Sequence, residues 1–195
     1  SIMFGFFEKK EAHVDEVKAP AFVEWKGWRK FKVMNRKQEC VDTTTFTLMP
    51  ADEQPLPAFR AGQGVALRLE GFEPRAYTLC CTPDEGCYRI TIKVLDNDRG
   101  ALSAQLAQCL HVGDEIEVSE PAGGFVLDDR ETPVVMIAEG IGITPMVAML
   151  SEIATDHPLR RVHLIYSTKN GEHFPLQEET KNLIKLIPDS GMAVG

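Results

Sequence analysis

The sequence predicts two successive folding units: an antiparallel β-barrel or sandwich, followed by a smaller parallel α/β unit. Six short segments of alternating or β-branched character, separated by Pro, Gly, Asp and Asn clusters, predict the first unit. After Pro133, strand-like and helix-like segments alternate, which is typical of a parallel sheet with crossover helices. This change of pattern places the boundary near residues 128–131.

The first unit is preceded by a charged segment. Residues 8–26 are rich in charge and lack a sustained apolar period, so residues 1–26 are predicted to be an N-terminal arm or linker. Residues 27–131 form the first unit, with one helix at 101–110 that places Leu102, Leu106 and Leu110 on one face. Its expected strands are 30–35, 43–49, 64–69, 76–81, 88–95 and 114–119.

The second unit covers residues 132–195. Its expected strands are 134–138 and 161–166, and its expected helices are 145–154 and 175–186. A sheet of only two strands would leave an edge unpaired. We therefore expect the chain to be incomplete at its C-terminus, either truncated or only partly represented by this sequence.

Composition narrows the class of protein. The 195 residues carry a net charge of −8, which argues against general nucleic-acid or anionic-membrane binding because both need a basic surface. Five cysteines without Cys-x-x-Cys spacing favour a reduced, cytoplasmic setting over a disulfide framework or a zinc site. The apolar stretch 134–150 is broken by Glu139 and by glycines, so no integral membrane segment is expected.

A glycine turn is the first segment that suggests chemistry. Gly140-Ile141-Gly142-Ile143-Thr144-Pro145 lies between the apolar run 134–138 and an apolar helical pattern. The order strand, glycine turn, helix points the first backbone N–H groups of the helix at an anion, as in nucleotide pyrophosphate sites. Many such turns are only tight turns, so the motif alone specifies function weakly.

Two earlier segments add support. On a strand, Arg75 and Tyr77 of Arg75-Ala76-Tyr77-Thr78 would face one side, and Ala76 and Thr78 the other. An arginine fork can hold a diphosphate, a tyrosine ring can lie against a heterocycle, and a threonine hydroxyl can donate to a ring nitrogen. Gly100-Ala101-Leu102-Ser103 offers a second anion site at a helix start. The plainer alternatives are an exposed Arg, a half-buried Tyr, a β-forming Thr and a helix N-terminus without ligand.

Five motifs in order resemble the ferredoxin-reductase-like flavoprotein superfamily. They are most similar to the reductase portion of flavohaemoglobins and related NADH-dependent electron-transfer reductases. The resemblance covers residues 26 to 187. The motifs are Gly27-Trp28-Arg29-Lys30-Phe31-Lys32-Val33, Ala61-Gly62-Gln63, Arg75-Ala76-Tyr77-Thr78, Gly100-Ala101-Leu102-Ser103 and Gly140-Ile141-Gly142-Ile143-Thr144-Pro145.

The resemblance implies a six-stranded antiparallel Greek-key barrel for FAD, followed by a partial parallel α/β domain for NAD(P)H, with NADH preferred. It implies that Arg75 holds the FAD phosphates, and that Tyr77 and Thr78 are the catalytic residues, packing on the isoalloxazine and bonding near flavin N5. The other implied FAD-binding residues are Ala76, Ile92, Lys93, Gly100, Ala101, Leu102 and Ser103. The implied NAD(P)H-binding residues are Gly140, Gly142, Ile143, Thr144 and Pro145.

The implied reaction is hydride transfer from NAD(P)H to flavin N5. Electrons would then pass to a haem, an iron–sulfur protein or a small molecule outside these residues, because no Cys-x4-Cys-x2-Cys run for a cluster is present. The alternative is a flavin-binding relay subunit, or vestigial module, that docks on a partner without oxidising NAD(P)H itself. We expect no metal site, and we assign the scattered histidines to surface or structural roles.

Two features of the predicted nucleotide-binding segment bear on the choice between a reductase and a relay subunit. Glu139 stands where the family carries a small residue, and its carboxylate would repel a pyrophosphate that it faced. After the second predicted strand, Lys169 follows Tyr166-Ser167-Thr168 in place of an acidic residue for the ribose. Glu139 favours the relay, and the intact glycine turn favours the reductase.

Overall fold

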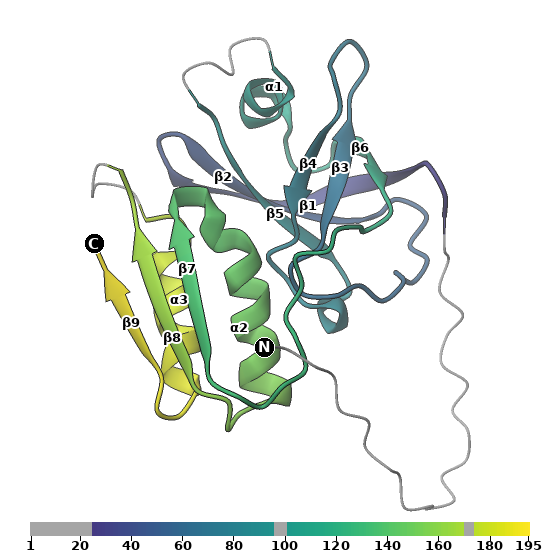
Figure 1. Cartoon of the computed structure of the whole chain (residues 1–195). Helices are drawn as coiled ribbons and strands as arrows, with labels where there is room; N and C mark the ends of the chain where they lie inside the picture. Colours follow the sequence, from purple (N-terminus) through teal and green to yellow (C-terminus); the bar gives the residue numbers. More distant parts are fainter. Residues whose placement is uncertain (1–24, 96–100, 170–173) are drawn as a thin grey trace, which may run out of the picture.

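The computed structural model describes residues 25–95, 101–169 and 174–195, which contain two sheets (Figure 1). The first sheet lies within residues 28–93 and 115–119, and the second within residues 134–194. The expected N-terminal arm falls almost wholly outside the described residues, as does Gly100.

Six antiparallel strands form the first sheet, in the order β4-β3-β6-β1-β2-β5. A further antiparallel bridge between Leu79 and Ile90 brings the ends of the two edge strands together, so the sheet closes as a barrel. This arrangement confirms the expected fold class of the first unit. The strands are β1 Trp28–Cys40, β2 Thr43–Pro50, β3 Gly64–Arg68, β4 Arg75–Thr78, β5 Tyr88–Lys93 and β6 Glu115–Ser119.

Alternation along the strands fills the barrel. In β1, Phe31 and Val33 are buried while Lys30 and Lys32 are exposed. Phe31 stacks on Tyr88 of β5 with ring centroids 5.1 Å apart. Helix α1 (Leu102–Cys109) covers one end of this core with Leu102 and Leu106. The helix therefore sits against the barrel with its N-terminus beside β4 (Figure 1).

Two strands of the barrel differ from the expected lengths. β1 runs to Cys40 instead of ending at residue 35, because the polar segment 36–38 keeps its backbone pairing with β2. Arg36 also donates to the carbonyls of Ala107 and Leu110, which satisfies the C-terminal end of α1. β4 ends at Thr78 instead of residue 81, and the chain beyond it makes only isolated pairs such as Cys80 N–H to Arg89 O.

The second sheet is parallel, in the order β7-β8-β9. The expectation of only two strands was wrong, because β9 is a third strand that pairs with β8. A 3-10 turn, η2 (Gly140–Ile143), also separates β7 from the helix that follows. The elements are β7 Val134–Glu139, α2 Thr144–Asp156, β8 Val162–Ser167, α3 Gln177–Leu186 and β9 Gly191–Val194, and a short η1 Pro83–Glu85 precedes β5.

Both helices of the second unit pack on one face of this sheet. Met136, Ala138, Leu164 and Tyr166 point to that face and are buried with side chains of α2 and α3. The alternate residues point the other way, and Val135 and Ile137 are 63% and 70% exposed. None of the residues that the structure describes covers this second face, which we call the bare face of the sheet (Val135, Ile137, His163 and Ile165).

The two sheets are packed against each other. Ala61 and Cys80 from the barrel side lie in one apolar cluster with Ile143, Met146 and Met149 of the second unit. At the connecting segment, the buried Arg160 donates to the Asp128 carboxylate and to the carbonyls of Asp128 and Thr132. These contacts fix the junction between the two sheets.

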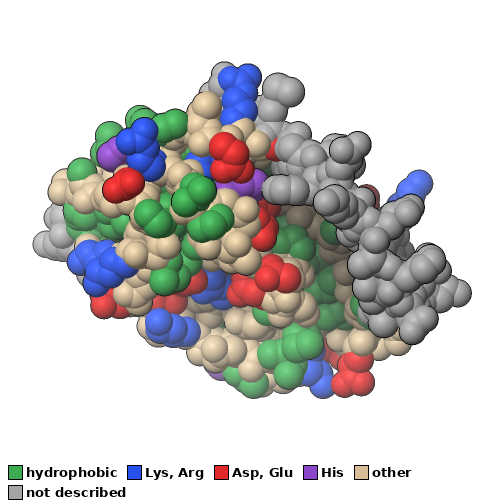
Figure 2. Space-filling model, turned by 90° about the horizontal axis from the view of Figure 1, so that it is seen from below, with side chains coloured by type: hydrophobic (Ala, Val, Ile, Leu, Met, Phe, Trp, Pro, Cys, Tyr) green, Lys and Arg blue, Asp and Glu red, His purple; other side chains and the backbone are tan. Residues whose placement is uncertain are grey.

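The surface carries mixed charge. Figure 2 shows acidic and basic side chains interspersed with apolar ones on the face it presents. Within the described ranges, every helix is too short or too polar to cross a membrane.

Candidate functional site

The motif on β4 meets the start of α1. Arg75 Nη1 donates to Ser103 Oγ at 3.1 Å, and Tyr77 Oη lies 2.7 Å from the same oxygen. Both side chains therefore lie on the same side of β4. Ser103 is itself only 2% exposed. A cation, a phenol and a hydroxyl thus converge at a helix N-terminus, which is a suitable arrangement for binding phosphate oxygens.

A shallow cavity of about 410 Å³ lies beside Tyr77 and Thr78. Small residues form much of its wall, among them Gly62, Gly64, Ala66, Ala76, Ala122 and Gly123. Gly62 has φ +105°, and a Cβ there would lie 1.9 Å from the carbonyl oxygen of Phe125. A Cβ on Gly64 would lie 2.6 Å from the carbonyl oxygen of Tyr77. Glycine is therefore required at both positions, because a side chain would collide with neighbouring backbone.

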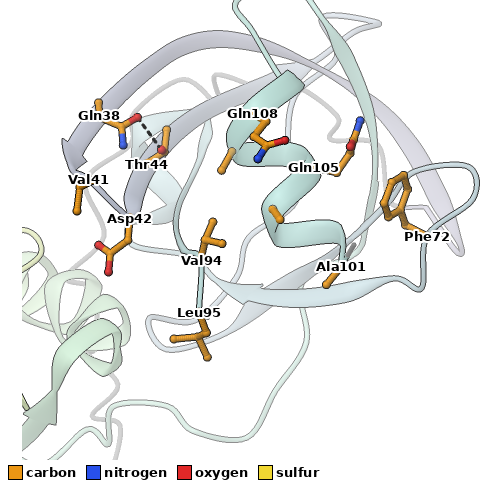
Figure 3. Close-up of a pocket in the computed structure, with 12 residues that line it drawn as sticks. Gln38, Val41, Asp42, Thr44, Phe72, Val94, Leu95, Ala101, Gln105 and Gln108 are labelled. Carbon is orange, nitrogen blue, oxygen red and sulfur yellow. Dashed lines mark hydrogen bonds between the residues drawn. The ribbon is translucent and has the colours of Figure 1, made fainter. Parts of the chain in front are cut away.

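A larger cavity of about 880 Å³ is lined in part by the first turn of α1 (Figure 3). It is bounded by the β1–β2 hairpin, the end of β5, α1 and Phe72. Ala101 lines it two residues before Ser103, and Gln105 follows one turn later. Amide side chains, the Asp42 carboxylate and small apolar surfaces form the wall, so the cavity suits a neutral group that can form hydrogen bonds.

The remaining predicted residues of the barrel lie around these cavities or in the core. Ile92 and Leu102 are buried in the barrel core and line neither cavity. Ala101 is extended and precedes the first turn of α1. Lys93 Nζ lies 4.0 Å from an Asp42 carboxylate oxygen, beside the larger cavity.

The glycine turn lies at the carboxyl end of β7. Gly140 has φ +54°, Gly142 is exposed, and Ile143 and Thr144 are buried. The Thr144 hydroxyl donates to Ile141 O at 3.1 Å, and Pro145 lies in the first turn of α2, where no N–H partner is needed. The structure thus groups these five residues in one turn. Glu139 immediately before them has an exposed side chain.

The two halves of the site are adjacent. The η2 turn contacts β5, so the glycine turn borders the barrel near the chain that follows β4. Cys80 lies in this region, and burial raises the pKa of its thiol to about 11 although the Arg89 charge opposes the shift. A neutral thiol and apolar side chains therefore separate the two halves, which keeps water out of the region between them.

Sequence reasoning missed three contributors to this region. The close approaches at Gly62 and Gly64 need a structure to be seen, although Ala61-Gly62-Gln63 was one of the motifs. Arg89 makes two hydrogen bonds to Glu179 of α3, 2.6 and 2.7 Å long, which join the two sheets. No periodic pattern links these residues, which are 90 positions apart.

Two protein-family models match the chain. The model described as an oxidoreductase FAD-binding domain matches residues 30–127. The model described as an oxidoreductase NAD-binding domain matches residues 136–194. The two matched ranges coincide with the barrel and with most of the parallel α/β unit.

Curated relatives and solved structures agree with these matches. A flavohemoprotein of Bacillus subtilis strain 168 is 36% identical over 167 residues, 83% of this chain and 41% of that protein. The chain spans about two fifths of the length of the curated relatives it matches. The FAD/NAD-binding domain of a nitric oxide dioxygenase from Vibrio cholerae O1 biovar El Tor has a TM-score of 0.79 and 30% identity, covering 85% of this chain and 73% of that one.

A third comparison comes from a reductase. Phthalate dioxygenase reductase, described as a modular structure for electron transfer from pyridine nucleotides to a 2Fe–2S centre, has a TM-score of 0.73 and 28% identity. The match covers 86% of this chain and 52% of that one.

Proposed function

Because the chain belongs to the family of oxidoreductase FAD-binding domains and continues into an oxidoreductase NAD-binding domain, we propose that it is the reductase part of an electron-transfer protein. It takes hydride from NAD(P)H onto FAD and passes the electrons to a separate acceptor. The observation that carries this proposal is the convergence of Arg75, Tyr77 and Ser103 beside a cavity walled by glycine and alanine.

The residues of the barrel fit FAD. In the proposal, the Arg75 guanidinium, the Ser103 hydroxyl and the N–H groups at the start of α1 bind the pyrophosphate. Tyr77 and Thr78 then border the isoalloxazine in the smaller cavity, and the larger cavity receives the adenosine end. When bound, FAD would accept the hydride and pass the electrons on to a separate redox centre.

The chain's own contribution is orientation. The glycine turn 140–143 and the first turn of α2 offer backbone N–H groups to the pyrophosphate of NAD(P)H. Their position beside β5 directs the nicotinamide toward the barrel, where close approach governs the rate of hydride transfer. We propose NADH as the preferred coenzyme. We also propose that residues 1–26 are an N-terminal arm, residues 27–131 the FAD-binding domain and residues 132–195 the NAD(P)-binding domain.

The acceptor in this proposal is a haem or iron–sulfur centre outside the chain. Two comparisons support this choice of acceptor. Matched relatives carry the name flavohemoprotein, and a structural neighbour is described as transferring electrons to a 2Fe–2S centre. Five free cysteines, two of them buried, support the proposed cytoplasmic setting. The relay alternative retains one favourable observation, the carboxylate of Glu139 immediately before the glycine turn.

The visible spectrum tests the proposal. We expect the purified protein to be yellow and to bleach when NADH is added without oxygen. Arg75→Ala should weaken FAD binding by about 1.5–3 kcal/mol, the range for a hydrogen bond to a charged group. Arg68→Ala is the matched control, because Arg68 pairs with Glu117 away from both cavities.

The outcomes separate the alternatives. A colourless protein that binds neither FAD nor FMN would contradict both the reductase and the relay. A yellow protein that NADH leaves oxidised, but that a chemical reductant bleaches, would support the relay.

A further inference from the structure

Arg89 and Glu179 form a direct polar link between the barrel and the parallel unit. Arg89 lies on β5 of the barrel, and Glu179 lies in the first turn of α3. The two guanidinium nitrogens donate to the two carboxylate oxygens at 2.7 and 2.6 Å. This is the bidentate geometry that makes an arginine–carboxylate pair both strong and directional. The side chains are 20% and 34% exposed, so solvent screens the pair only partly.

The Arg89 guanidinium makes a third hydrogen bond. Arg89 Nη2 also donates to the carbonyl oxygen of Cys80, in the segment that follows β4. One side chain therefore ties α3 to β5 and to the chain that continues from Tyr77 and Thr78. The glycine turn, which bridges β7 and α2, contacts the same strand β5. The glycine turn and α3 thus both meet the barrel at β5.

We propose that Arg89 and Glu179 form a positioning pair that sets the distance between the glycine turn and the flavin side of the barrel. This inference rests on the proposed reductase function. Neither residue touches the bound groups in this proposal. The pair acts through the placement of α3 and η2, and a displacement of about 1 Å is enough to slow hydride transfer by up to a hundredfold.

The test uses Arg89→Gln, Glu179→Gln and the double variant in the full chain. Glu117→Gln is the matched control, because Arg68 and Glu117 form another bidentate pair, at 2.8 and 3.1 Å, that stays within the barrel sheet. Hydrogen exchange reports the coupling without depending on flavin. In each of the three variants at positions 89 and 179, we expect faster hydrogen exchange in both η2 and the first turn of α3, while β1 and β6 keep wild-type rates.

The kinetic readout is the rate constant for flavin reduction at saturating NADH. We expect at least a tenfold decrease in Glu179→Gln with unchanged FAD content, and no decrease in Glu117→Gln. Because the two residues act as one unit, the double variant should be no slower than Arg89→Gln, which also loses the hydrogen bond to Cys80 O. Additive effects, or exchange that rises only in α3, would overturn the proposal.

The two proposals fail in different ways. Absence of flavin binding would contradict the proposed function, while the exchange experiment would still decide whether the pair couples α3 to η2. If NADH reduces the bound FAD and exchange in η2 is unchanged in all three variants, the reductase stands and the positioning pair is rejected.

Discussion

Arg160 shows how one charged residue holds the junction of the two sheets. Its side chain is 1% exposed, and it donates to the Asp128 carboxylate at 2.7 Å and to the carbonyls of Asp128 and Thr132. A buried charge of this kind is tolerated only when its partners are in place. Arg160 therefore fixes the path of the segment that leads from the barrel into β7.

Replacement of this residue should be strongly destabilising. We expect Arg160→Met to lower the free energy of unfolding by about 3–5 kcal/mol, because Asp128 would be left as a buried carboxylate without its cation. Urea denaturation measures the change. Arg161→Met is the control, since the neighbouring Arg161 is exposed and its loss should change stability by less than about 0.5 kcal/mol. Equal effects of the two substitutions would contradict this account.

Asp129, next to Asp128 in the sequence, should make the stability of the protein depend on pH. Its side chain is buried and both carboxylate oxygens lack a hydrogen-bond partner within the described part of the chain. Burial raises the pKa of this carboxyl above 3.8, and the Arg60 charge opposes the shift only partly. The folded state therefore binds the proton more tightly than the unfolded state does.

The sign of the pH effect follows. Stability should increase as pH falls from neutral through the raised pKa of Asp129 toward 3.8, because the folded protein takes up the proton first. In Asp129→Asn this contribution is absent. We expect the difference in unfolding midpoint between wild type and Asp129→Asn to move in favour of wild type as pH is lowered from 7 toward 3.8. A difference that does not change with pH would show that Asp129 is solvated.

At the scale of elements, the loop between β2 and β3 limits what can occupy position 62. Gly62 combines φ +105° with a Cβ position 1.9 Å from Phe125 O and 2.8 Å from Met149 Cε of α2. The loop, the segment after β6 and α2 therefore meet at one point. A side chain here would push these three elements apart, and the loop and the segment after β6 both line the smaller cavity.

Gly113 provides the comparison for this site. It has φ +94° but no atom within 4 Å of its Cβ position, so Gly113→Ala should cost only the backbone strain of about 1–2 kcal/mol. Gly62→Ala should cost more than that, and it should also weaken FAD retention. Urea denaturation and the flavin content of the purified variants measure both effects. Similar losses of stability and flavin in Gly62→Ala and Gly113→Ala would mean that the loop between β2 and β3 shifts without cost to accommodate the added methyl group.

The sequence predicted the elements with a clear period and missed those without one. Alternation along β1, β2 and β5 was sufficient for the barrel, and the glycine turn was sufficient for the start of the parallel unit. β9 has only four residues, too few to establish a period. The polar half of β1 was missed because its pairing with β2 is a backbone property that side-chain patterns do not report.

The candidate site divides in the same way. Arg75, Tyr77 and Ser103 were identified from local motifs, and the structure brings the three together. Their roles toward FAD remain predictions. The link from Arg89 to Glu179 could not be predicted, since it depends on how two separately folded sheets pack.

At the scale of the whole molecule, the bare face of the second sheet should govern solution behaviour. Parallel sheets in proteins are usually covered on both faces, and exposed apolar patches favour association. Ile137, on the edge strand β7, is 70% exposed on this face. We expect Ile137→Lys to reduce light scattering on heating of concentrated protein. Leu159→Lys is the control, because Leu159 is 84% exposed but lies in the turn before β8. Equal scattering from both variants would exclude the sheet face as the cause.

The pairing of β1 with β6 also sets an order of events during synthesis. Residues 28–32 find their partners only at 115–119, so the barrel cannot close until almost all of its chain has left the ribosome. The β1–β2 hairpin, by contrast, needs only residues 28–50. The parallel unit, at residues 134–194, emerges after all the strands of the barrel. This strand order therefore favours an early hairpin, a later closure of the barrel and the docking of the parallel unit after that.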